Sequence, residues 1–477
     1  MLVEERIFEN AKLFPEKLAI IAGSAEVTYL ELVHRILLAA KYYENSGLQK
    51  GDRVVVSASK CVDFVYAYFG AHIAGLICVP IDSETNPVRL QRIEDCAAPK
   101  LFVGELRNKG ERNVIPFAEV SAEEEAEIKM PRPSDIADIL FTTGTTGLPK
   151  GVSLSFFNQQ AAAEQINAFV GNTADDVELL ALPISHSFGL GRLRCVLSKG
   201  ATIALLSSFA SMKKFYAGLD LYNVTGFSMV PSSWNYIQKM SGAKLANYAS
   251  RLKYIEIGSA FMPEAEKRKL MEMLPTTRIC MHYGLTEASR SAFMSFHDDE
   301  AHLMSIGKPS PGRKIAIFSE KGEEVANGQE GELCVAGDHV CSAYWGQSEA
   351  DFRKDFFGEF FRTGDWGYID NDGYIYLKSR IKEIINVGGK KVSPVEVEEA
   401  LNAMDGITES ACIGVKDDVM GEIVKAFIVG TLTETDDEAI KKYVMAHIEN
   451  YKVPAIIEHI AELPKTTSGK LQRLLLK

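Results

Sequence analysis

The sequence predicts an α/β protein. We expect a large N-terminal domain of parallel-rich sheets with packed helices and a small β-rich subdomain, followed by a small, mobile α+β C-terminal domain. Over the first 310 residues, short apolar or β-branched runs alternate with stretches of helical spacing, which is typical of parallel sheets covered by helices. After about residue 310, short strands punctuated by glycine take over. A chain of 477 residues with 46% hydrophobic composition can form two or three domains with large cores.

Apolar periodicity locates the elements of the N-terminal part. We expect strands at 53–59, 100–104, 201–206 and 314–318, and helices at 29–43 and 156–170. One segment, 64–81, is nearly free of charge and approaches the length of a membrane span. It contains His72, Gly75 and Pro80, so it is better interpreted as a buried helix followed by a buried strand at 75–81.

The C-terminal part has a different pattern. Strands with alternating apolar residues are expected at 330–337, 361–370 and 373–380. The last hundred residues form a separate unit, in which we expect a helix at 394–404, strands at 409–417 and 423–430, and an amphipathic helix at 436–450. The predicted domains are therefore 1–380 and 381–477, with a hinge near Lys382 in a charged stretch.

Composition excludes several classes of protein. A formal net charge of −12 argues against a broad nucleic-acid surface, which needs a basic face. Eight cysteines without a C-x-x-C pair signal neither a zinc site nor a disulfide framework, and are typical of a cytosolic enzyme. The N-terminal residues lack an apolar signal core. We expect a cytoplasmic protein with no membrane span and no nucleic-acid partner.

A loop rich in glycine and threonine joins two strand-like segments, 136–140 and 151–155. Glycines allow positive φ, and successive backbone N–H groups in such a turn can bind an anion. Threonine hydroxyls and one lysine add donors, although the spacing is not that of a P-loop. From the residues alone, phosphate binding is only modestly favoured over an ordinary surface hairpin. The candidate binding residues are Thr142, Thr143, Gly144, Thr145, Thr146, Gly147 and Lys150.

The segment TTGTTGLPKG at 142–151 resembles the phosphate-loop signature of the adenylate-forming superfamily, which comprises acyl-CoA synthetases, adenylation domains and luciferases. Further segments resemble this superfamily in the same order along the chain, and the overall pattern is most similar to acyl- or aryl-acid CoA ligases. They are LPISHSFGL (182–190), EIGSA (256–260), HYGLTEAS (282–289), FRTGDWG (361–367), KSRIKEIINVGGKKVSPVEVE (378–398) and PKTTSGKLQR (464–473). Such order over most of the chain identifies it as a member of the superfamily.

The resemblance implies roles for residues in the segments at 182–190, 256–260 and 282–289. His186, Ser187 and Phe188 would face the acyl substrate, with His186 near the reacting carboxylate. The adenine would lie along Gly258, Ser259 and Ala260 and stack on Tyr283, with Gly284 beside both nucleotide and substrate. Thr286 would contact the α-phosphate, and Glu287 would be the Mg²⁺ ligand.

The resemblance also implies roles in the C-terminal segments. Asp365 would bind the ribose hydroxyls, and Arg380 the ribose or a phosphate. Lys382 falls at the hinge, and Gly388 and Gly389 would form the loop that enters the site for thiolation. Lys470 would be the catalytic lysine of adenylation.

The implied reaction is that of an acid–thiol ligase. ATP converts a carboxylic acid to acyl-AMP with release of pyrophosphate, and the acyl group then passes to the thiol of CoA or of a carrier-protein phosphopantetheine. Amino-acid-activating relatives have Asp at the position of Ser187, so we disfavour an α-amino acid and expect a fatty or aromatic acid. The short chain mildly favours CoA as acceptor. An enzyme that loads a carrier protein and a catalytically silent acyl-AMP-binding protein remain as alternatives.

Overall fold

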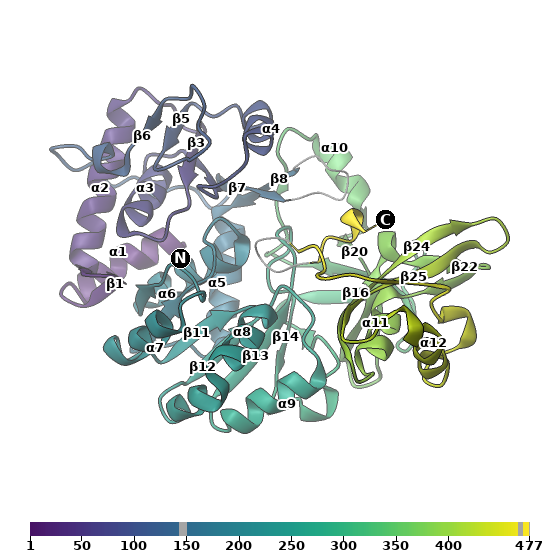
Figure 1. Ribbon diagram of the computed structural model, residues 1–477. Helices are drawn as coiled ribbons and strands as arrows, with labels where there is room; N and C mark the ends of the chain where they lie inside the picture. Colours follow the sequence, from purple (N-terminus) through teal and green to yellow (C-terminus); the bar gives the residue numbers. More distant parts are fainter. Residues whose placement is uncertain (143–149, 466–470, 477) are drawn as a thin grey trace. The chain divides into compact units, whose positions relative to one another are not determined.

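The computed structural model describes residues 1–142, 150–465 and 471–476, and the chain forms two compact units (Figure 1). Unit 1 comprises Met1–Ile315 and Val335–Phe361, and unit 2 comprises Ala316–Cys334 and Arg362–Lys477. The α/β fold class is confirmed, with sheets and helices alternating through unit 1. The domain limit that the sequence suggests near residue 380 remains a prediction.

A nine-stranded sheet forms one layer of unit 1. Its six inner strands are parallel, and antiparallel strands complete both edges. This arrangement is expected where helical crossovers connect successive strands. In spatial order the strands are β15 (Lys308–Pro309), β14 (Ala292–Ser295), β13 (Arg278–Tyr283), β12 (Tyr254–Ile257), β11 (Gly226–Met229), β9 (Val177–Leu180), β10 (Thr202–Leu205), β1 (Leu18–Ala22) and β2 (Ala25–Thr28).

A seven-stranded sheet forms the second layer. Strands β7 and β8 are antiparallel neighbours, and β4, β3, β5 and β6 continue from β7 in parallel. In spatial order the strands are β18 (Ala343–Tyr344), β8 (Lys150–Ser155), β7 (Ile136–Thr142), β4 (Ile77–Ile81), β3 (Arg53–Ser57), β5 (Leu101–Val103) and β6 (Val114–Ile115).

Helices pack on these sheets, and two of them matter most for the site. Helix α5 begins at a capping box in which the Ser155 hydroxyl accepts from the Asn158 backbone N–H, and it ends at Gly171 with φ +82°. Helix α6 ends in the same way at Gly200, and it is buried from Phe188 to Leu197. The helices of unit 1 are α1 (Val3–Leu13), α2 (Tyr29–Asn45), α3 (Val62–Ile73), α4 (Pro87–Ala97), α5 (Phe156–Val170), α6 (Ser187–Lys199), α7 (Met212–Leu221), α8 (Pro231–Ser241), α9 (Glu264–Met273) and α10 (Glu349–Phe352).

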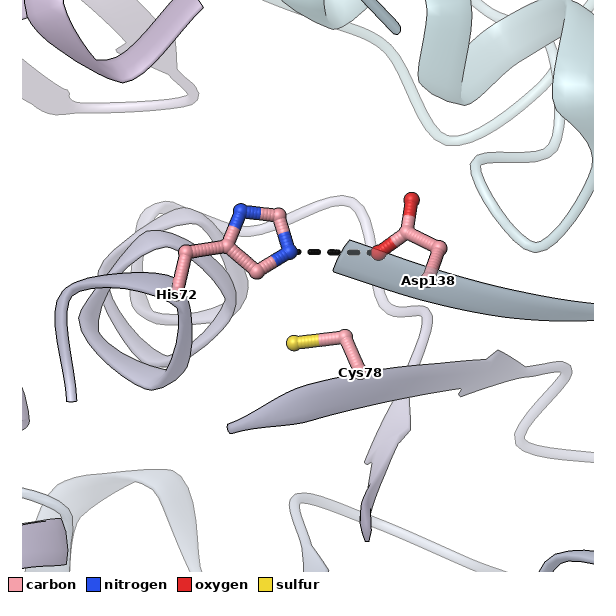
Figure 2. Close-up of side chains that lie close together, drawn as sticks. All are labelled: His72, Cys78 and Asp138. Atoms are coloured by element: carbon pink, nitrogen blue, oxygen red, sulfur yellow. Dashed lines mark hydrogen bonds and ion pairs between the residues drawn. The ribbon is translucent and has the colours of Figure 1, made fainter. Parts of the chain in front are cut away.

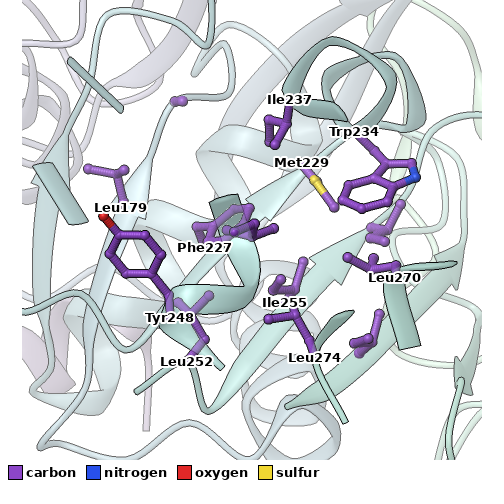
Figure 3. Close-up of a cluster of buried hydrophobic side chains, with 14 of the residues drawn as sticks. Leu179, Phe227, Met229, Trp234, Ile237, Tyr248, Leu252, Ile255, Leu270 and Leu274 are labelled. Atoms are coloured by element: carbon purple, nitrogen blue, oxygen red, sulfur yellow. The ribbon is translucent and has the colours of Figure 1, made fainter. Parts of the chain in front are cut away.

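The core of unit 1 contains a large cluster between the nine-stranded sheet and helices α7–α9. Figure 3 shows Phe227 and Met229 of β11 and Ile255 of β12 facing Trp234 of α8 and Leu270 of α9. Full burial of one such side chain stabilises the fold by about 1.5–3 kcal/mol. The parallel strands that carry site residues at their ends therefore belong to a rigid layer.

Unit 2 contains the glycine-punctuated strands predicted after residue 310. They belong to a five-stranded sheet, of which β19 and the ends of three other strands fall in the residue ranges of unit 1. Its strands are β16 (Lys314–Phe318), β17 (Gly331–Ala336), β20 (Phe360–Ile369), β19 (Phe356–Phe357) and β21 (Ile375–Arg380). A second sheet has the order β23 (Lys390–Val392), β22 (Ile385–Val387), β25 (Gly421–Gly430) and β24 (Ile407–Asp417), with β26 (Ile456–His459) beside β25. Helices α11 (Pro394–Asn402) and α12 (Asp437–Met445) contribute to its separate hydrophobic core.

Most predicted elements agree with the structure to within two residues at either end. The strands at 53–59, 100–104, 201–206 and 314–318, and the helices at 29–43 and 156–170, are confirmed. The weakly charged segment 64–81 forms most of α3 and all of β4, as predicted. Helix α12 ends at Met445, five residues before the predicted end, because a turn follows in which the His447 ring bonds the Tyr443 carbonyl oxygen.

Two further observations concern membrane segments and thiols. Within the described ranges, none of the helices has both the length and the hydropathy needed to cross a membrane. All eight cysteines lie in these ranges and all are free. Six are buried, Cys61 is half-buried, and Cys96 on α4 is exposed.

Candidate active site

The ends of the predicted phosphate loop are held by two paired strands. Thr142 is the last residue of β7 and Lys150 is the first residue of β8, and the two face each other in the antiparallel register. Gly151 allows β8 to pack closely, because a Cβ atom there would lie 2.8 Å from Ile139 Cγ2. The other predicted loop residues, Thr143, Gly144, Thr145, Thr146 and Gly147, lie outside the described residues.

Glu287, the predicted Mg²⁺ ligand, is linked to Lys150 through an aromatic ring. The hydroxyl of Tyr344 donates to Glu287 Oε1 over 2.9 Å. The Nζ atom of Lys150 lies 4.5 Å from the centre of the same ring, within the range of a cation–π contact. The backbone N–H of Cys341 also donates to the Glu287 carbonyl oxygen. Tyr344, on the short strand β18 beside β8, therefore holds a carboxylate and an ammonium group next to each other.

Three of the predicted motifs converge on the buried carboxylate of Glu256, at the end of β12. His282 Nδ1 lies 2.7 Å from Glu256 Oε1, and Arg290 Nε donates to the same oxygen over 3.1 Å. The Arg290 guanidinium also donates to the backbone carbonyl oxygens of Ser187 and Phe188. The ring of Phe188 in turn meets the ring of His282 edge-on, with 4.6 Å between ring centres. Residues 187–188, Glu256 and His282 are thus brought together around Arg290, and the roles predicted for their segments remain predictions.

Two glycines make this convergence possible. A Cβ atom on Gly258 would lie 2.1 Å from His282 Cε1, and one on Gly284 would lie 2.4 Å from the Arg290 backbone nitrogen. Real Cβ atoms do not approach other atoms so closely, so only glycine fits at either position. Ser259 adopts a positive φ of +73°, and both Ser259 and Ala260 are exposed. Ser259 and Ala260 therefore present an exposed stretch of backbone, whereas Gly258 and Tyr283 are buried.

The charges around Glu256 balance one another. Burial alone would raise the pKa of Glu256, but Arg290, His282 and Arg192 together hold it well below its usual value. The pKa of His282 is lowered, first by burial and then by Arg290, so its ring is neutral near pH 7. Arg192 forms a second ion pair with Glu178, with its Nε donating over 2.9 Å. The protein interior around Glu256 therefore contains two carboxylates and two guanidinium groups, all fully or nearly fully buried. They belong to Glu178, Glu256, Arg192 and Arg290.

A pocket between α5 and α6 opens at the predicted substrate and phosphate residues. Its lining includes both Ser187, predicted to face the acid, and Thr286, predicted to contact the α-phosphate. The pocket comprises about 390 Å³ of empty space, including its open mouth. Much of this space belongs to the mouth, so the enclosed part of the pocket is small. His186 is exposed at the N-cap of α6, next to the lining residue Ser187.

Two of the predicted site residues in unit 2 form an ion pair. Asp365 on β20 and Arg380 at the end of β21 are partners in the antiparallel register, and Arg380 Nε lies 2.7 Å from Asp365 Oδ1. Arg380 Nη1 also donates to the Thr363 carbonyl oxygen. The Asp365 carboxylate is buried, whereas Arg380 is exposed. A carboxylate fixed in this way could accept hydrogen bonds from two neighbouring hydroxyl groups of a ligand.

The remaining predicted residues of unit 2 are exposed or not described. Lys382 lies in a single 3₁₀ turn, Ile381–Glu383, directly after β21, and it is exposed. Gly388 and Gly389 form the turn between β22 and β23 with φ values of +58° and +80°, which favour glycine. Lys470 lies outside the described residues. The roles predicted for these four residues remain predictions.

The sequence analysis missed four residues of this site. Glu256 has a recognisable signal, because it is a lone carboxylate in a strand that is otherwise apolar. Arg290 directly follows the HYGLTEAS segment but does not belong to it. Tyr344 and Gln159, another lining residue of the pocket, have no local signal. Their hydrogen-bond partners, Glu287 for Tyr344 and Asp138 for Gln159, are distant in the sequence.

Comparison with known proteins identifies two matching family models along the chain. Residues 7–345 match the family model of the AMP-binding enzyme, and residues 396–470 match that of the AMP-binding enzyme C-terminal domain. The long-chain-fatty-acid–CoA ligase of Bacillus subtilis is 31% identical, with 98% of this chain and 92% of that protein aligned.

Solved structures are similar as well. The o-succinylbenzoate CoA synthetase of Bacillus subtilis, in complex with its acyl-adenylate intermediate, has a TM-score of 0.90 and 26% identity, covering 99% of this chain and 97% of that one. The same synthetase in complex with ATP and magnesium ion has a TM-score of 0.88 and 26% identity, covering 99% and 98% of the two chains.

Proposed function

Because the chain belongs to the AMP-binding enzyme family, we propose that it joins a carboxylic acid to the thiol of CoA in an ATP-dependent reaction, through an acyl-AMP intermediate. A free carboxylate is a poor acyl donor, since its leaving group would be an oxide. Attack of the carboxylate on the α-phosphate of ATP forms the acyl–phosphate bond and releases pyrophosphate. Attack of the CoA thiolate on the acyl carbon then forms the thioester and releases AMP.

The observation that carries this proposal is the arrangement of Glu287, Tyr344 and Lys150. It places one carboxylate and one ammonium group at the strands that flank the glycine–threonine loop. Mg²⁺ is commonly bound by one or two protein carboxylates together with substrate phosphates, and the single half-buried carboxylate of Glu287 fits that donor set. When bound, Mg²⁺ would neutralise charge on the phosphate oxygens. Lys150 would hold the phosphates that leave as pyrophosphate.

The other residues of unit 1 would position the two reactants. Thr286 and Ser187 line one pocket, so an acid bound there would have its carboxylate near the α-phosphate. The backbone of Gly258, Ser259 and Ala260 would accept the flat adenine next to Tyr283. His186, exposed next to the lining residue Ser187, would orient the carboxylate.

The residues of unit 2 would act in turn. Asp365, held by Arg380, would accept hydrogen bonds from the ribose hydroxyls. Lys470 would stabilise the negative charge that accumulates as the carboxylate attacks phosphorus. For the second half-reaction, a rotation about Lys382 would remove Lys470 and present the turn at Gly388 and Gly389 to the thiol.

The relatives favour CoA as the thiol. The two relatives described above are named as a CoA ligase and a CoA synthetase. Incubation of the enzyme with ATP, an acid and either CoA or a phosphopantetheinylated carrier protein, followed by mass spectrometry, distinguishes the two acceptors. Thioester formed on the carrier alone would refute the choice of CoA.

Pyrophosphate exchange into ATP tests the first half-reaction. We expect acid-dependent exchange with wild-type protein and a loss of at least about 100-fold in Lys470→Ala, comparable to the loss of other transition-state donors. Thioester formation from supplied acyl-AMP should change little in this variant. Lys442→Ala removes an exposed lysine of α12 and serves as the control. Absence of exchange with every acid would instead support a catalytically silent binding protein.

A further inference from the structure

The pocket between α5 and α6 contains a buried acceptor with no donor. Gln159 of α5 lines the pocket and is 3% exposed. Among the described residues, no group donates a hydrogen bond to its side-chain oxygen Oε1. A buried carbonyl oxygen without a donor costs about 1–3 kcal/mol, so such atoms are rare unless a ligand satisfies them.

The orientation of the Gln159 amide is determined by its other contact. Its Nε2 donates to Asp138 Oδ2 over 2.8 Å. The pKa of Asp138 is lowered: burial alone would raise it, but the hydrogen bond and charge of His72 and the charge of Arg194 outweigh that effect. The carboxylate is therefore ionised near pH 7 and can only accept hydrogen bonds. Exchanging the two ends of the amide would place its oxygen against that carboxylate, which is unfavourable. The oxygen is thus the end of the Gln159 amide that is free to accept.

A buried polar network forms the wall behind Gln159. Figure 2 shows His72 of α3 directed at Asp138 of β7, with 3.2 Å between His72 Nε2 and Asp138 Oδ1. Cys78 of β4 lies beside them (Figure 2). Arg194 of α6, another lining residue of the pocket, donates to Asp138 Oδ2 over 2.7 Å. A long apolar chain extending past this wall would have to displace buried ion pairs, which is strongly unfavourable.

The other flank of α6 is closed in the same way. Gly191 lines the pocket, and the space where its side chain would lie is taken by Arg290, whose Nη1 is 2.9 Å from the position of a Cβ atom. Behind it lie Arg192 and Glu256, both fully buried. Within the described part of unit 1, both sides of α6 thus meet charged groups rather than an apolar tunnel.

We propose that this pocket selects a compact carboxylic acid that carries an O–H or N–H donor, and that Gln159 Oε1 accepts the hydrogen bond from that donor. The proposal rests on the proposed function and names the substrate class of the same site. The lining combines the polar residues Asn158, Ser289 and His339, which accompany Gln159, with apolar residues that would contact the short carbon chain, namely Leu154, Ala162, Ala163 and Ile166. The wall at Asp138 and Arg194 restricts the length of the acyl group. This narrows the sequence-based expectation of a fatty or aromatic acid towards its smallest and most polar members.

Matched pairs of acids test the proposal on the unaltered enzyme. Short acids are compared with analogues of equal carbon number that carry a hydroxyl or a primary amide, and with linear acids of about eight carbons or more, by pyrophosphate exchange. We expect the best donor-bearing acid to exceed its plain analogue at least about tenfold in kcat/KM, equivalent to about 1.4 kcal/mol. We expect long linear acids to be at least tenfold poorer than that acid. Equal rates within every pair, or a preference for long chains, would overturn the proposal.

A substitution then tests the residue. In Gln159→Met the ratio of kcat/KM for the donor-bearing acid to kcat/KM for its plain analogue should fall to near one. Gln160→Met, one position along α5 on its more exposed side, should retain the preference. A preference that persists in folded Gln159→Met would overturn the assignment. If that variant does not fold, the acid pairs on wild-type enzyme still decide the substrate class. Failure of the wild-type enzyme to catalyse pyrophosphate exchange with any of the acids would instead contradict the proposed function itself.

Discussion

Replacing Tyr344 with phenylalanine removes one hydroxyl from the Glu287 carboxylate and leaves the ring below Lys150 in place. The hydroxyl donates to Glu287 Oε1 over 2.9 Å, and the ring lies 4.5 Å from Lys150 Nζ. The pKa of Tyr344 is raised, first by burial and then by the charge of Glu287, so this hydroxyl is protonated in any ordinary assay. Tyr344→Phe therefore changes one donor and little else.

The expected magnitude follows from this bond. A hydrogen bond to a charged group contributes about 1.5–3 kcal/mol, and because Glu287 is half-buried we take the lower limit, about tenfold in an equilibrium constant. Loss of a group that orients a metal ligand typically costs about 10–100-fold in metal affinity, which agrees with that limit. We expect the Mg²⁺ concentration for half-maximal pyrophosphate exchange to rise about tenfold. The free energy of unfolding without ligands should change by less than about 1 kcal/mol, because water can replace the hydroxyl.

The assay is a Mg²⁺ titration of pyrophosphate exchange at saturating acid, with thermal unfolding measured in parallel. Tyr443→Phe is the matched control, since its exposed hydroxyl bonds a backbone oxygen, that of Ala403, over 3.1 Å. A folded Tyr344→Phe enzyme with an unchanged Mg²⁺ midpoint would refute the reasoning. It would show that Tyr344 does not orient the metal ligand.

Two further predictions concern stability. Glu256→Gln leaves Arg290 and Arg192 buried without their shared carboxylate, so urea unfolding at pH 7 should show a loss of about 3–5 kcal/mol. Because the pKa of Glu256 is lower in the folded state than its unfolded value of about 4.3, the ionised carboxylate stabilises the fold above that pH. The difference in free energy of unfolding between wild type and Glu256→Gln should therefore shrink as the pH falls below about 4.3. A difference that stays constant would contradict this prediction. The pKa of Lys267 is lowered to about 8, chiefly by burial, so the unfolded chain binds an extra proton between about pH 8 and 10.4. As the pH rises from about 7.5 to about 10, the free energy of unfolding of wild type should therefore increase relative to that of Lys267→Met. An equal difference between the two proteins at both pH values, measured by urea unfolding, would contradict this prediction.

Much of the fold follows from local patterns in the sequence. The alternation of strands and helices predicts parallel sheets, and helical spacing predicts the helix at 156–170, whose ends the structure places at the local caps Ser155 and Gly171. The order of strands could not be predicted in the same way. Strand β1 lies beside β10, more than 180 residues later, because of packing between distant segments. The apolar periodicity of either segment does not indicate which strand lies beside it.

The candidate site shows the same division between local and distant information. The motif residues His186, Thr286 and Glu287 are recognisable from their own segments, whereas their supports are not. His72 is an example, because the sequence marks it only as a polar residue in an apolar stretch. In the structure its ring nitrogens contact Glu4 and Asp138, which are 68 and 66 residues away. Buried polar side chains need such partners, but the sequence does not indicate which they are.

The distribution of thiols allows the predicted rotation to be measured. Cys96 on α4 is the exposed cysteine of the eight, whereas Cys61 is half-buried and the others are enclosed. A maleimide dye should therefore attach to α4 selectively, at mildly alkaline pH because burial raises the pKa of the Cys96 thiol. A second thiol introduced at the exposed Lys442 of α12 would place the partner dye on unit 2. Energy transfer between the two dyes would then report each change of domain orientation during a single turnover.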